Sequence, residues 1–446
     1  MKRILKELNL KDRLKARSKN LFFSLADKSK TTQYLPHLIT KYYGDPSKKL
    51  KLIGITGTNG KTTTTYLIYQ ALQHLEHKTG LIGTINILIG DQLYETNLTT
   101  PKPSRISKLL SKMVKRKCSY CVMEVSSIGL VEFRVNGLKF SAGVFTNFTQ
   151  DHMNYHKTMD NYRYAKSLLF QKVSNEGIAV FNRDDPNWTT FRNATKAKIA
   201  TYGYKDRNSV KDSLNGTYQN IDFLIHKTDL SGSLIEIDGY MGNFKLLGKF
   251  NAYNLAAAYT TLCALGLDKE KIFNALTKST PPPGRLQLVN PDYDVKTPKV
   301  IVDYAHTPDA LENVLITLRD LINKKGRLVT VFGCGGDRDK LKRAEMGRIA
   351  NKYSDKVMIT SDNPRSEDPE SIIKDILEGI ENTSNILTEI SRKEAITRVI
   401  KESSPSDTIL IAGKGHESYQ EINGNKTYFD DIKIAFEALR FQNPRH

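Results

Sequence analysis

A glycine-rich loop with a lysine and threonines is the strongest chemical signal in the sequence. The segment Thr56-Gly-Thr-Asn-Gly-Lys-Thr62 follows an apolar run at 52–56 and opens a predicted helix over 61–75. In that context backbone N–H groups and the helix N-terminus bind phosphate. Lys61 is expected to reach the terminal phosphates and Thr62 to offer its hydroxyl to Mg²⁺. The residues predicted to bind phosphate are Gly57, Thr58, Asn59, Gly60, Lys61, Thr62 and Thr63.

The spacing of this loop departs from the usual G-x-x-x-x-G-K-[ST] pattern, because the first position is Ile55. The alternative is a glycine turn beside a chance Lys-Thr pair. The order strand, loop, helix favours a variant phosphate loop over that alternative.

Two further polar clusters also follow apolar segments. Glu124 ends the predicted strand 120–125, where the edge of a parallel sheet would face the phosphate loop and a carboxylate suits Mg²⁺. Asn147, Asp151 and His152 follow a second predicted strand, and Lys166 lies in a stretch with helical character. Each of these residues taken alone is more often a solvated or structural side chain.

Alternating apolar runs and helical stretches predict an α/β fold with parallel sheets. The predicted strands are 52–56, 81–85, 120–125, 142–146, 178–181, 299–303, 327–332, 356–360 and 408–412. The predicted helices are 2–19, 61–75, 161–173, 309–323, 340–352 and 370–381, and residues 200–247 look richer in short strands. Pro281-Pro-Pro-Gly284 interrupts the alternation, which predicts a domain boundary near residue 284.

Composition excludes several classes of protein. The 446 residues are 39% hydrophobic and 26% charged, as in globular proteins, and four cysteines exclude a disulfide scaffold. Cys118-x-x-Cys121 has the spacing of half a zinc site, but no second pair accompanies it. No apolar run approaches the roughly 20 residues of a membrane span, and the N-terminus lacks a signal-peptide core. A cytoplasmic location is expected.

The net charge of +19 is unevenly distributed. Residues 1–50 hold 13 Lys and Arg against four Asp and Glu. The plain interpretation is a set of solvated lysines, and the alternative is a basic arm that binds a polyanion, a membrane surface or a partner protein. Nucleic acid is not an expected partner.

The motifs occur together in an order that resembles the Mur ligase family, from about Tyr43 to about Ala438. Beyond the phosphate loop they are Met123-Glu-Val-Ser-Ser-Ile-Gly-Leu130, Phe145-Thr-Asn-Phe-Thr-Gln-Asp-His152, Lys166, Leu247-Gly-Lys-Phe-Asn-Ala-Tyr-Asn254, Gly284-Arg285, Asp303-Tyr-Ala-His-Thr-Pro308, Gly333-Cys-Gly-Gly-Asp-Arg-Asp-Lys340, Asp362-Asn-Pro-Arg365 and Gly413-Lys-Gly-His-Glu417. The family comprises ATP-dependent amide ligases of peptidoglycan precursor synthesis.

Within the family, the sequence is most similar to enzymes that add the third peptide residue, a diamino acid, to UDP-MurNAc-L-Ala-D-Glu. The segment Asp362-Asn-Pro-Arg365 matches the form that selects meso-diaminopimelate. Diaminopimelate has a second α-carboxylate that lysine lacks, and the arginine fork is suited to bind a carboxylate.

The resemblance implies that ATP converts the glutamate γ-carboxylate into an acyl phosphate, which the incoming amine then attacks. It implies ATP and Mg²⁺ as cofactors, small-molecule substrates and a monomeric enzyme. By the resemblance, the catalytic residues are Lys61, Glu124, His152 and Lys166, with Lys166 matching a lysine that many members carry as a carbamate. Thr62, Glu124 and His152 match the metal-binding positions.

The resemblance also assigns substrate-binding residues. Besides the phosphate loop, the ATP-binding positions are Asn251, Asn254, Arg285 and Asp303. The positions that bind the acceptor are Thr99, Thr100, Ser126 and Arg134. The positions that bind the incoming amino acid are Arg343, Asp362, Asn363, Arg365, Gly413 and Glu417. Arg343 and Arg365 are expected to meet its distal carboxylate, Glu417 its distal ammonium group, and Asp303 the ribose hydroxyls of ATP.

The implied architecture has three parts. Residues 51–284 would form a central P-loop-type parallel-sheet ATPase domain, and residues 285–446 a C-terminal Rossmann-like α/β domain that binds the amino acid. Residues 1–50 form a reduced N-terminal segment, shorter than the uridine-binding domain of the family. A second departure is Ile128, which stands where the third-residue enzymes usually carry histidine.

Two other functions remain open on the sequence. One is a ligase of the same chemistry with a different, non-UDP acceptor, and the other is a non-catalytic Mur-like protein. A folate-type polyglutamate ligase shares the phosphate loop, but the segment from Asp362 to Arg365 argues against it.

Overall fold

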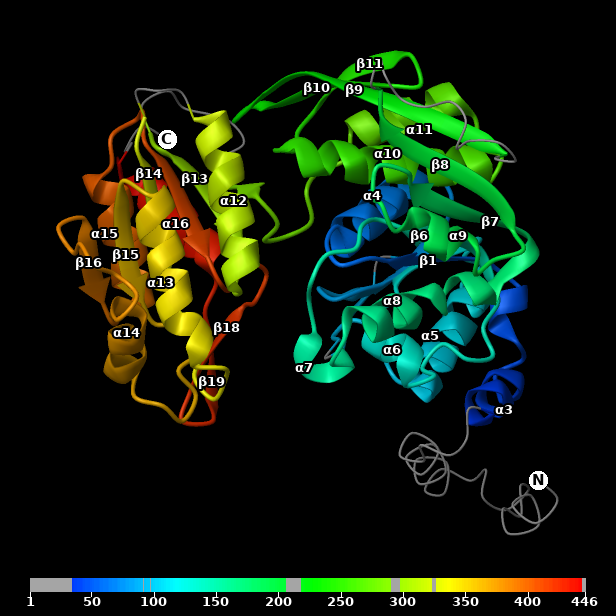
Figure 1. Cartoon of the computed structure of the whole chain (residues 1–446), viewed down its shortest axis with the longest axis horizontal. Coiled ribbons are helices and arrows are strands. Elements are labelled where there is room, and N and C mark those ends of the chain that lie inside the picture. Colours follow the sequence, from blue (N-terminus) through cyan, green and yellow to red (C-terminus); the bar gives the residue numbers. More distant parts are fainter. Residues whose placement is uncertain are drawn as a thin grey trace, which may run out of the picture. The chain divides into compact units, whose positions relative to one another are not determined.

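The computed structural model describes residues 34–90, 92–96, 98–205, 218–289, 297–322 and 326–442. The helix predicted over 2–19 lies outside them. The described chain divides into two compact units, drawn in Figure 1. The first unit runs to His226 and adds Leu234–Phe244 and Phe250–Ser279, and the second comprises Lys227–Ser233, Lys245–Lys249 and the described residues from Thr280 onwards.

The larger sheet has, among the described residues, 11 strands in the order β11-β10-β9-β8-β7-β6-β1-β5-β2-β3-β4. The strands are β1 (Lys51–Thr56), β2 (Thr79–Ile82), β3 (Ile87–Ile89), β4 (Gln92–Tyr94), β5 (Tyr120–Glu124), β6 (Phe140–Phe145), β7 (Val173–Asn182), β8 (Lys198–Tyr204), β9 (Gln219–Asp229), β10 (Gly232–Ile237) and β11 (Tyr240–Phe244). Strand β1 pairs in parallel with β5 on one side and β6 on the other. The carboxyl ends of these three strands therefore meet at one edge, as expected for a nucleotide-binding α/β sheet.

The helices that precede residue 278 connect and cover these strands. They are α3 (Leu35–Tyr42), η1 (Pro46–Lys48), α4 (Lys61–His74), α5 (Pro103–Lys115), α6 (Ser127–Val131), α7 (Met153–His156), α8 (Met159–Ser167), η2 (Phe170–Lys172), α9 (Trp188–Arg192), α10 (Lys249–Ala264) and α11 (Lys269–Thr277). Helix α4 begins directly after Gly60, which adopts a left-handed backbone with φ 83°. The phosphate loop is thus a short connection between β1 and α4.

The second unit contains a six-stranded sheet in the order β12-β13-β17-β14-β15-β16 and the separate hairpin β18-β19. The strands are β12 (Gln287–Leu288), β13 (Lys299–Asp303), β14 (Leu328–Phe332), β15 (Lys356–Thr360), β16 (Ile386–Glu389), β17 (Thr408–Ala412), β18 (Tyr419–Ile422) and β19 (Asn425–Tyr428). The helices are α12 (Pro308–Leu321), α13 (Leu341–Tyr353), α14 (Pro369–Leu377), α15 (Arg392–Glu402) and α16 (Asp431–Gln442). Within the six-stranded sheet, the described strand pairs are parallel except β12 with β13, and the β18-β19 hairpin is antiparallel.

Successive side chains along these strands pack into two apolar cores, one on each face of the six-stranded sheet. Ile301 lies in one apolar cluster with residues of α12, α13 and α14. Its neighbours Val300 and Val302 lie in another cluster with residues of α15 and α16. Because successive strand residues point to opposite faces, the sheet is covered by helices on both faces. This is the doubly wound arrangement that the alternating sequence predicts.

The structure confirms the predicted α/β fold but corrects three element ends. The helix predicted over 161–173 ends at Ser167, and Val173 instead starts β7 by pairing with Phe140 of β6. The strand predicted over 81–85 ends at Ile82, because the next residues turn toward Glu124. The helix predicted over 370–381 ends at Leu377, before Gly379 packs against the backbone of α13.

A fully buried ion pair joins the helices on one face of the second sheet. Arg392, at the start of α15, bonds both carboxylate oxygens of Asp431 at 2.7 and 2.8 Å. Arg392 also donates to the carbonyl of Ala412 at the end of β17. The pair therefore connects α15, α16 and the strand that leads into the Gly413 loop.

Replacing Arg392 with leucine is expected to destabilise the second unit by about 3–5 kcal/mol, because Asp431 would keep a buried charge without its partner. Urea denaturation followed by circular dichroism measures this loss. The control is Arg398→Leu, which breaks an exposed pair with Glu402 on the same helix and is expected to cost at most about 1 kcal/mol. Equal losses in the two variants would contradict the account.

Candidate functional site

The phosphate loop is clamped by residues that follow β6. A Cβ atom at Gly57 would lie 1.8 Å from Thr146 Oγ1, so only glycine fits this position. Thr146 Oγ1 donates to the Asn59 carbonyl at 2.6 Å, and Asn147 Oδ1 accepts the Asn59 amide at 2.9 Å. The loop is therefore held in shape by its neighbour in the sheet, which a phosphate-binding loop requires.

Two lysines converge on this loop. Lys61 Nζ donates to the carbonyl of Gly57 at 2.9 Å, and Lys166 Nζ donates to the same oxygen at 2.6 Å. Lys166 is buried and packs over the ring of Tyr162. Burial, with the nearby charge of Lys61, lowers the pKa of Lys166 well below that of an ordinary lysine.

Glu124 is fully buried at the end of β5 and accepts three hydrogen bonds. Thr62 Oγ1 donates to Oε2 at 2.9 Å, and Thr84 donates its amide to Oε1 at 2.7 Å and its hydroxyl to Oε2 at 2.9 Å. This carboxylate links the start of α4 to the turn after β2. The structure thus brings the predicted pair Thr62 and Glu124 into direct contact.

The donor set around Glu124 fits a hard cation. Its oxygen donors are the type that Mg²⁺ prefers, and Mg²⁺ commonly takes one or two protein ligands together with phosphate and water. Within the described ranges, no group of three or more His, Cys, Asp and Glu side chains could hold a metal. His152 sits outside such a cluster, with φ 54° and its ring 3.5 Å from the Asp151 carboxylate.

The four predicted acceptor-binding residues lie beside Glu124, and three of them form one hydrogen-bonded group around Thr100. Thr100 Oγ1 donates to the Glu124 carbonyl at 3.0 Å and accepts the Ser126 amide at 2.9 Å. Arg134 Nη1 donates to the Thr100 carbonyl at 2.7 Å, and Thr99 Oγ1 accepts from Thr84 at 3.1 Å. These segments come from separate parts of the sequence and meet at the same sheet edge.

Asn251 and Asn254 on α10 lie against the start of α4. Asn254 Oδ1 accepts from Thr64 at 3.2 Å, and its amide nitrogen donates to Asn251 Oδ1 at 2.9 Å. A Cβ atom at Gly60 would approach Asn254 Oδ1 to 2.4 Å. Both asparagines are therefore part of the wall behind the phosphate loop.

The two other predicted ATP-contacting residues lie in the second unit. Asp303 ends β13, and its carboxylate accepts the amides of Leu286 and Ala305 at 2.7 and 2.8 Å. Burial raises the pKa of Asp303. Arg285 lies over the ring of Tyr304, 4.9 Å from its centroid, and its buried Nε lacks a hydrogen-bond partner.

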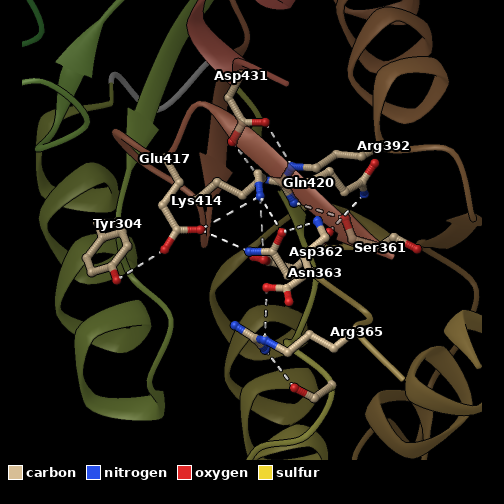
Figure 2. Close-up of polar contacts among 12 residues, drawn as sticks. Tyr304, Ser361, Asp362, Asn363, Arg365, Arg392, Lys414, Glu417, Gln420 and Asp431 are labelled. Atoms are coloured by element: carbon tan, nitrogen blue, oxygen red, sulfur yellow. Dashed lines mark hydrogen bonds and ion pairs between the residues drawn. The ribbon is translucent and has the colours of Figure 1, made fainter. Parts of the chain in front are cut away.

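Polar side chains cluster at the carboxyl ends of β15 and β17, where the amino-acid pocket is expected, and Figure 2 shows their contacts. Asn363 Nδ2 donates to Glu417 Oε2 at 2.9 Å, and Asn363 Oδ1 accepts from Lys414 Nζ at 3.1 Å. Gly413 has φ 115°, and a Cβ atom there would lie 2.6 Å from Asp362. Glycine thus lets the two loops approach, and the structure brings these predicted amino-acid-binding residues together.

Arg365 is held beside this pocket by its own backbone. Its φ is 52°, a left-handed conformation that is costly for a side chain other than glycine. Its amide donates to the Glu421 carbonyl at 3.0 Å, and its Nη1 donates to the Gly336 carbonyl at 2.6 Å. These contacts fix the guanidinium between the Gly336 loop and the β18-β19 hairpin.

Arg343, predicted to meet the substrate carboxylate, contacts protein carboxylates in this structure. Its side chain is fully buried on α13, and its guanidinium bonds both oxygens of Glu367 at 2.9 Å and one of Asp375 at 2.8 Å. These bonds hold the loop around Glu367 against α13. The role of Arg343 in binding the amino acid stays a prediction.

Sequence reasoning missed several residues of the site. Thr84 was assigned to a strand, although the preceding Gly83 signals a turn. Tyr162 bonds Thr58 at 3.3 Å and packs against Lys166, and no local pattern marks it. Lys414 belongs to the quoted Gly-Lys-Gly-His-Glu segment, and a lysine between two glycines beside a carboxylate was the available signal.

Family models match both units. The Mur ligase middle domain matches residues 55–262, and the Mur ligase glutamate ligase domain matches residues 284–415. Among the described helices, none is long and apolar enough to cross a membrane.

Three curated relatives carry the same ligase name. The UDP-N-acetylmuramoyl-L-alanyl-D-glutamate--2,6-diaminopimelate ligase of Phocaeicola vulgatus is 42% identical over 409 residues, which cover 91% of this chain and 81% of the relative. The ligase of that name, numbered 1, from Clostridium acetobutylicum is 44% identical over 405 residues, covering 90% and 80%. The relative from Bacillus cereus is 42% identical over 415 residues, covering 92% and 82%.

Solved structures are also similar to this chain. A structure of UDP-N-acetylmuramoyl-L-alanyl-D-glutamate--2,6-diaminopimelate ligase is 33% identical with a TM-score of 0.65 and covers 92% of this chain and 82% of that chain. Mycobacterium tuberculosis folylpolyglutamate synthase complexed with ADP and AMPPCP has a TM-score of 0.65 at 17% identity, covers 92% and 94%, and so shares the fold alone. The sequence identities and the matched domains together show that the chain belongs to the Mur ligase family of ATP-dependent, ADP-forming amide ligases.

Proposed function

We propose that this chain is the ligase that adds meso-diaminopimelate to UDP-MurNAc-L-Ala-D-Glu in peptidoglycan precursor synthesis. The observation that carries the proposal is the pocket formed by Asn363, Arg365 and Glu417 at the ends of two parallel strands. It combines a carboxylate for an ammonium group with a fixed guanidinium for a carboxylate. The curated relatives that carry this activity in their names support the same assignment.

The first chemical step joins two anions, and the residues of the first unit lower its barrier. An oxygen of the glutamate γ-carboxylate attacks the terminal phosphorus of ATP, ADP leaves, and an acyl phosphate results. Lys61 and the backbone amides of its loop bind the phosphates, and the loop contacts from Thr146 and Asn147 keep those amides in place. When bound at Thr62 and Glu124, Mg²⁺ supplies positive charge to the transferring phosphate.

The second step forms the amide. The amine nitrogen of diaminopimelate attacks the acyl carbon, inorganic phosphate leaves, and the nitrogen loses a proton. Glu417 and Arg365 orient the distal end of diaminopimelate, which is the end that does not react.

Lys166 is proposed to act as a carbamate. Only the neutral amine adds to carbon dioxide, and burial lowers the pKa of Lys166 so that the neutral form is accessible. The carbamate would place a negative charge near Lys61, where it would support a second cation beside His152. A ligase that consumes ATP and a nucleotide-linked precursor is expected in the cytoplasm, and we propose that location.

Mass spectrometry of the product tests the proposal. Incubation of the wild-type chain with ATP, Mg²⁺, UDP-MurNAc-L-Ala-D-Glu and diaminopimelate is expected to yield the tripeptide nucleotide. Binding of ATP without any product would favour a ligase with a different acceptor, and the uridine group would then be the first feature to vary.

Lys61→Ala is expected to lower kcat by about 10²-fold or more, since a positioned cation on transferring phosphate typically contributes that much. Phosphate release from ATP measures the loss. Lys78→Ala removes an exposed lysine of the same unit and serves as the control. Turnover retained by Lys61→Ala would refute the phosphate-loop assignment.

Arg365→Lys is expected to lower kcat/KM for diaminopimelate by about 10- to 100-fold, because the bidentate fork is lost. The value for L-lysine should change little, since L-lysine has no distal carboxylate. Both substrates are compared by phosphate release, with Arg398→Lys as the control on α15. Equal losses for the two substrates would rule out the carboxylate role.

Lys166→Ala is expected to be nearly inactive and to recover part of its kcat when formate or acetate is added, because these acids replace the carbamate. Phosphate release with increasing acid gives the rescue. The same acids should leave the activity of the wild-type chain unchanged. An absence of rescue together with an unmodified lysine in the intact protein's mass spectrum would eliminate the carbamate.

A further inference from the structure

Lys414 is a buried cation that faces the acceptor groups of the amino-acid pocket. Its side chain is fully buried in the loop after β17. Its Nζ lies 3.1 Å from Asn363 Oδ1, 3.9 Å from Asp362 Oδ1 and 3.8 Å from Glu417 Oε2. Figure 2 shows these three groups gathered around the one ammonium group.

The contacts of Asn363 fix the orientation of its amide. Oδ1 accepts from Lys414 Nζ and from the Glu421 backbone amide at 2.9 Å, and both of these groups are donors only. A flipped amide would oppose donor to donor at both contacts. Nδ2 must therefore point to Glu417 Oε2, to which it donates at 2.9 Å. Lys414 and the Glu421 amide thus together determine which face of Asn363 points to Glu417.

Charged groups of both signs surround Glu417. Asp362 adds a second carboxylate, and Lys414 and Arg365 add positive charge. Glu421 adds a further carboxylate, which lies 3.6 Å from Arg365 Nε. The buried Arg392–Asp431 pair stands behind Lys414, and Tyr304 Oη and the ring of Tyr419 also face the pocket. Since Glu421 pairs with Arg365, Lys414 is the cation that offsets Asp362 and Glu417 most directly.

Burial sets the direction in which the pKa values of Glu417 and Lys414 shift. It raises the pKa of Glu417, with a further rise from Asp362 and an opposing fall from Lys414. Burial also lowers the pKa of Lys414, while Asp362 opposes that shift. Loss of the lysine charge would leave two carboxylates to share the pocket, and one of them would then hold a proton more readily.

We infer that Lys414 is a positioning and charge-balancing residue for substrate selection: with the Glu421 amide it orients the Asn363 side chain, and its charge favours the ionised form of Glu417 as the partner of an ammonium group. The inference rests on the proposed function, because the ammonium group is that of diaminopimelate. Lys414 itself does not touch the substrate in this scheme. Its effect is to let the pocket accept a zwitterionic end, with an ammonium group at Glu417 and a carboxylate at Arg365.

The test is the pH dependence of kcat/KM for diaminopimelate in Lys414→Met, a change that keeps the side chain's length and removes its charge. Ammonium binding is lost as pH falls through the pKa of Glu417, so the acid limb of the profile is expected to move upward by about one pH unit or more. At a fixed pH on that limb, kcat/KM then falls about tenfold per unit. A merely structural loss would lower the profile at every pH without moving the limb.

Lys426→Met is the matched control. Lys426 lies on β19 over the ring of Tyr419, but it is exposed, so water screens its charge. The acid limb of the kcat/KM profile of Lys426→Met should stay at the wild-type pH. Asp362→Asn is the second variant, and removal of that carboxylate should move the limb downward. If Lys414→Met does not fold, the Asp362→Asn profile decides, and an unmoved limb overturns the inference.

A direct titration separates this inference from the proposed function. Carboxyl carbons of glutamate are labelled with ¹³C in the full chain, and the Glu417 resonance is assigned by its loss in Glu417→Gln. The pKa of Glu417 is expected to rise in Lys414→Met and to stay unchanged in Lys426→Met. An unchanged pKa in Lys414→Met overturns the inference even where turnover is normal. A wild-type chain without diaminopimelate-dependent turnover overturns the proposed function, and the titration still decides the role of Lys414.

Discussion

Charged side chains buried at the carboxyl ends of parallel strands are the constraint on which both units depend. A buried ion without a partner costs several kcal/mol in real proteins, so each one must be paired or hydrogen-bonded. Glu124 satisfies this requirement with Thr62 and Thr84, and Arg392 satisfies it with Asp431 and a strand carbonyl. Because the partners come from different loops, satisfying each charge also fixes the loops relative to one another within a unit.

The same pairing prepares the site for its chemistry. In the first unit, Lys61 and Lys166 donate to one carbonyl oxygen and place two amines beside the phosphate loop. In the second unit, Lys414 and Asn363 hold the Glu417 carboxylate, and the strained backbone of Arg365 holds a guanidinium near it. Lys61 thus stands where phosphate is expected, and a carboxylate stands where an ammonium group is expected. This arrangement needs little reorganisation when substrates bind.

The fold and much of the site could be predicted from the sequence, for identifiable reasons. Strands 299–303, 356–360 and 408–412 are largely apolar runs between helices, buried except for the first residue of the first two, and their ends agree with the structure. The phosphate loop was visible because its glycines and Lys61 are contiguous. Site residues scattered along the chain, such as Thr100 and Asn254, were assigned only through the family resemblance, and their roles in substrate binding stay predictions.

The sequence could not show which residues contact one another when they lie far apart in the chain. Whether an arginine contacts a protein carboxylate depends on neighbours far away in the chain, and no local pattern around Arg343 indicates its contacts with Glu367 and Asp375. The predicted end of the helix over 161–173 is wrong for a similar reason. Val173 joined a strand because Phe140 of β6 was available to pair with it, which no local pattern around residue 173 indicates.

The most direct measurement of the central claim is phosphate release by the wild-type chain with ATP, Mg²⁺ and UDP-MurNAc-L-Ala-D-Glu, to which meso-diaminopimelate or L-lysine is added separately. The account predicts release that depends on diaminopimelate and is far weaker with lysine, since Arg365 recognises the additional carboxylate. Release that is equal with the two amino acids, or absent with both while ATP still binds, would contradict it.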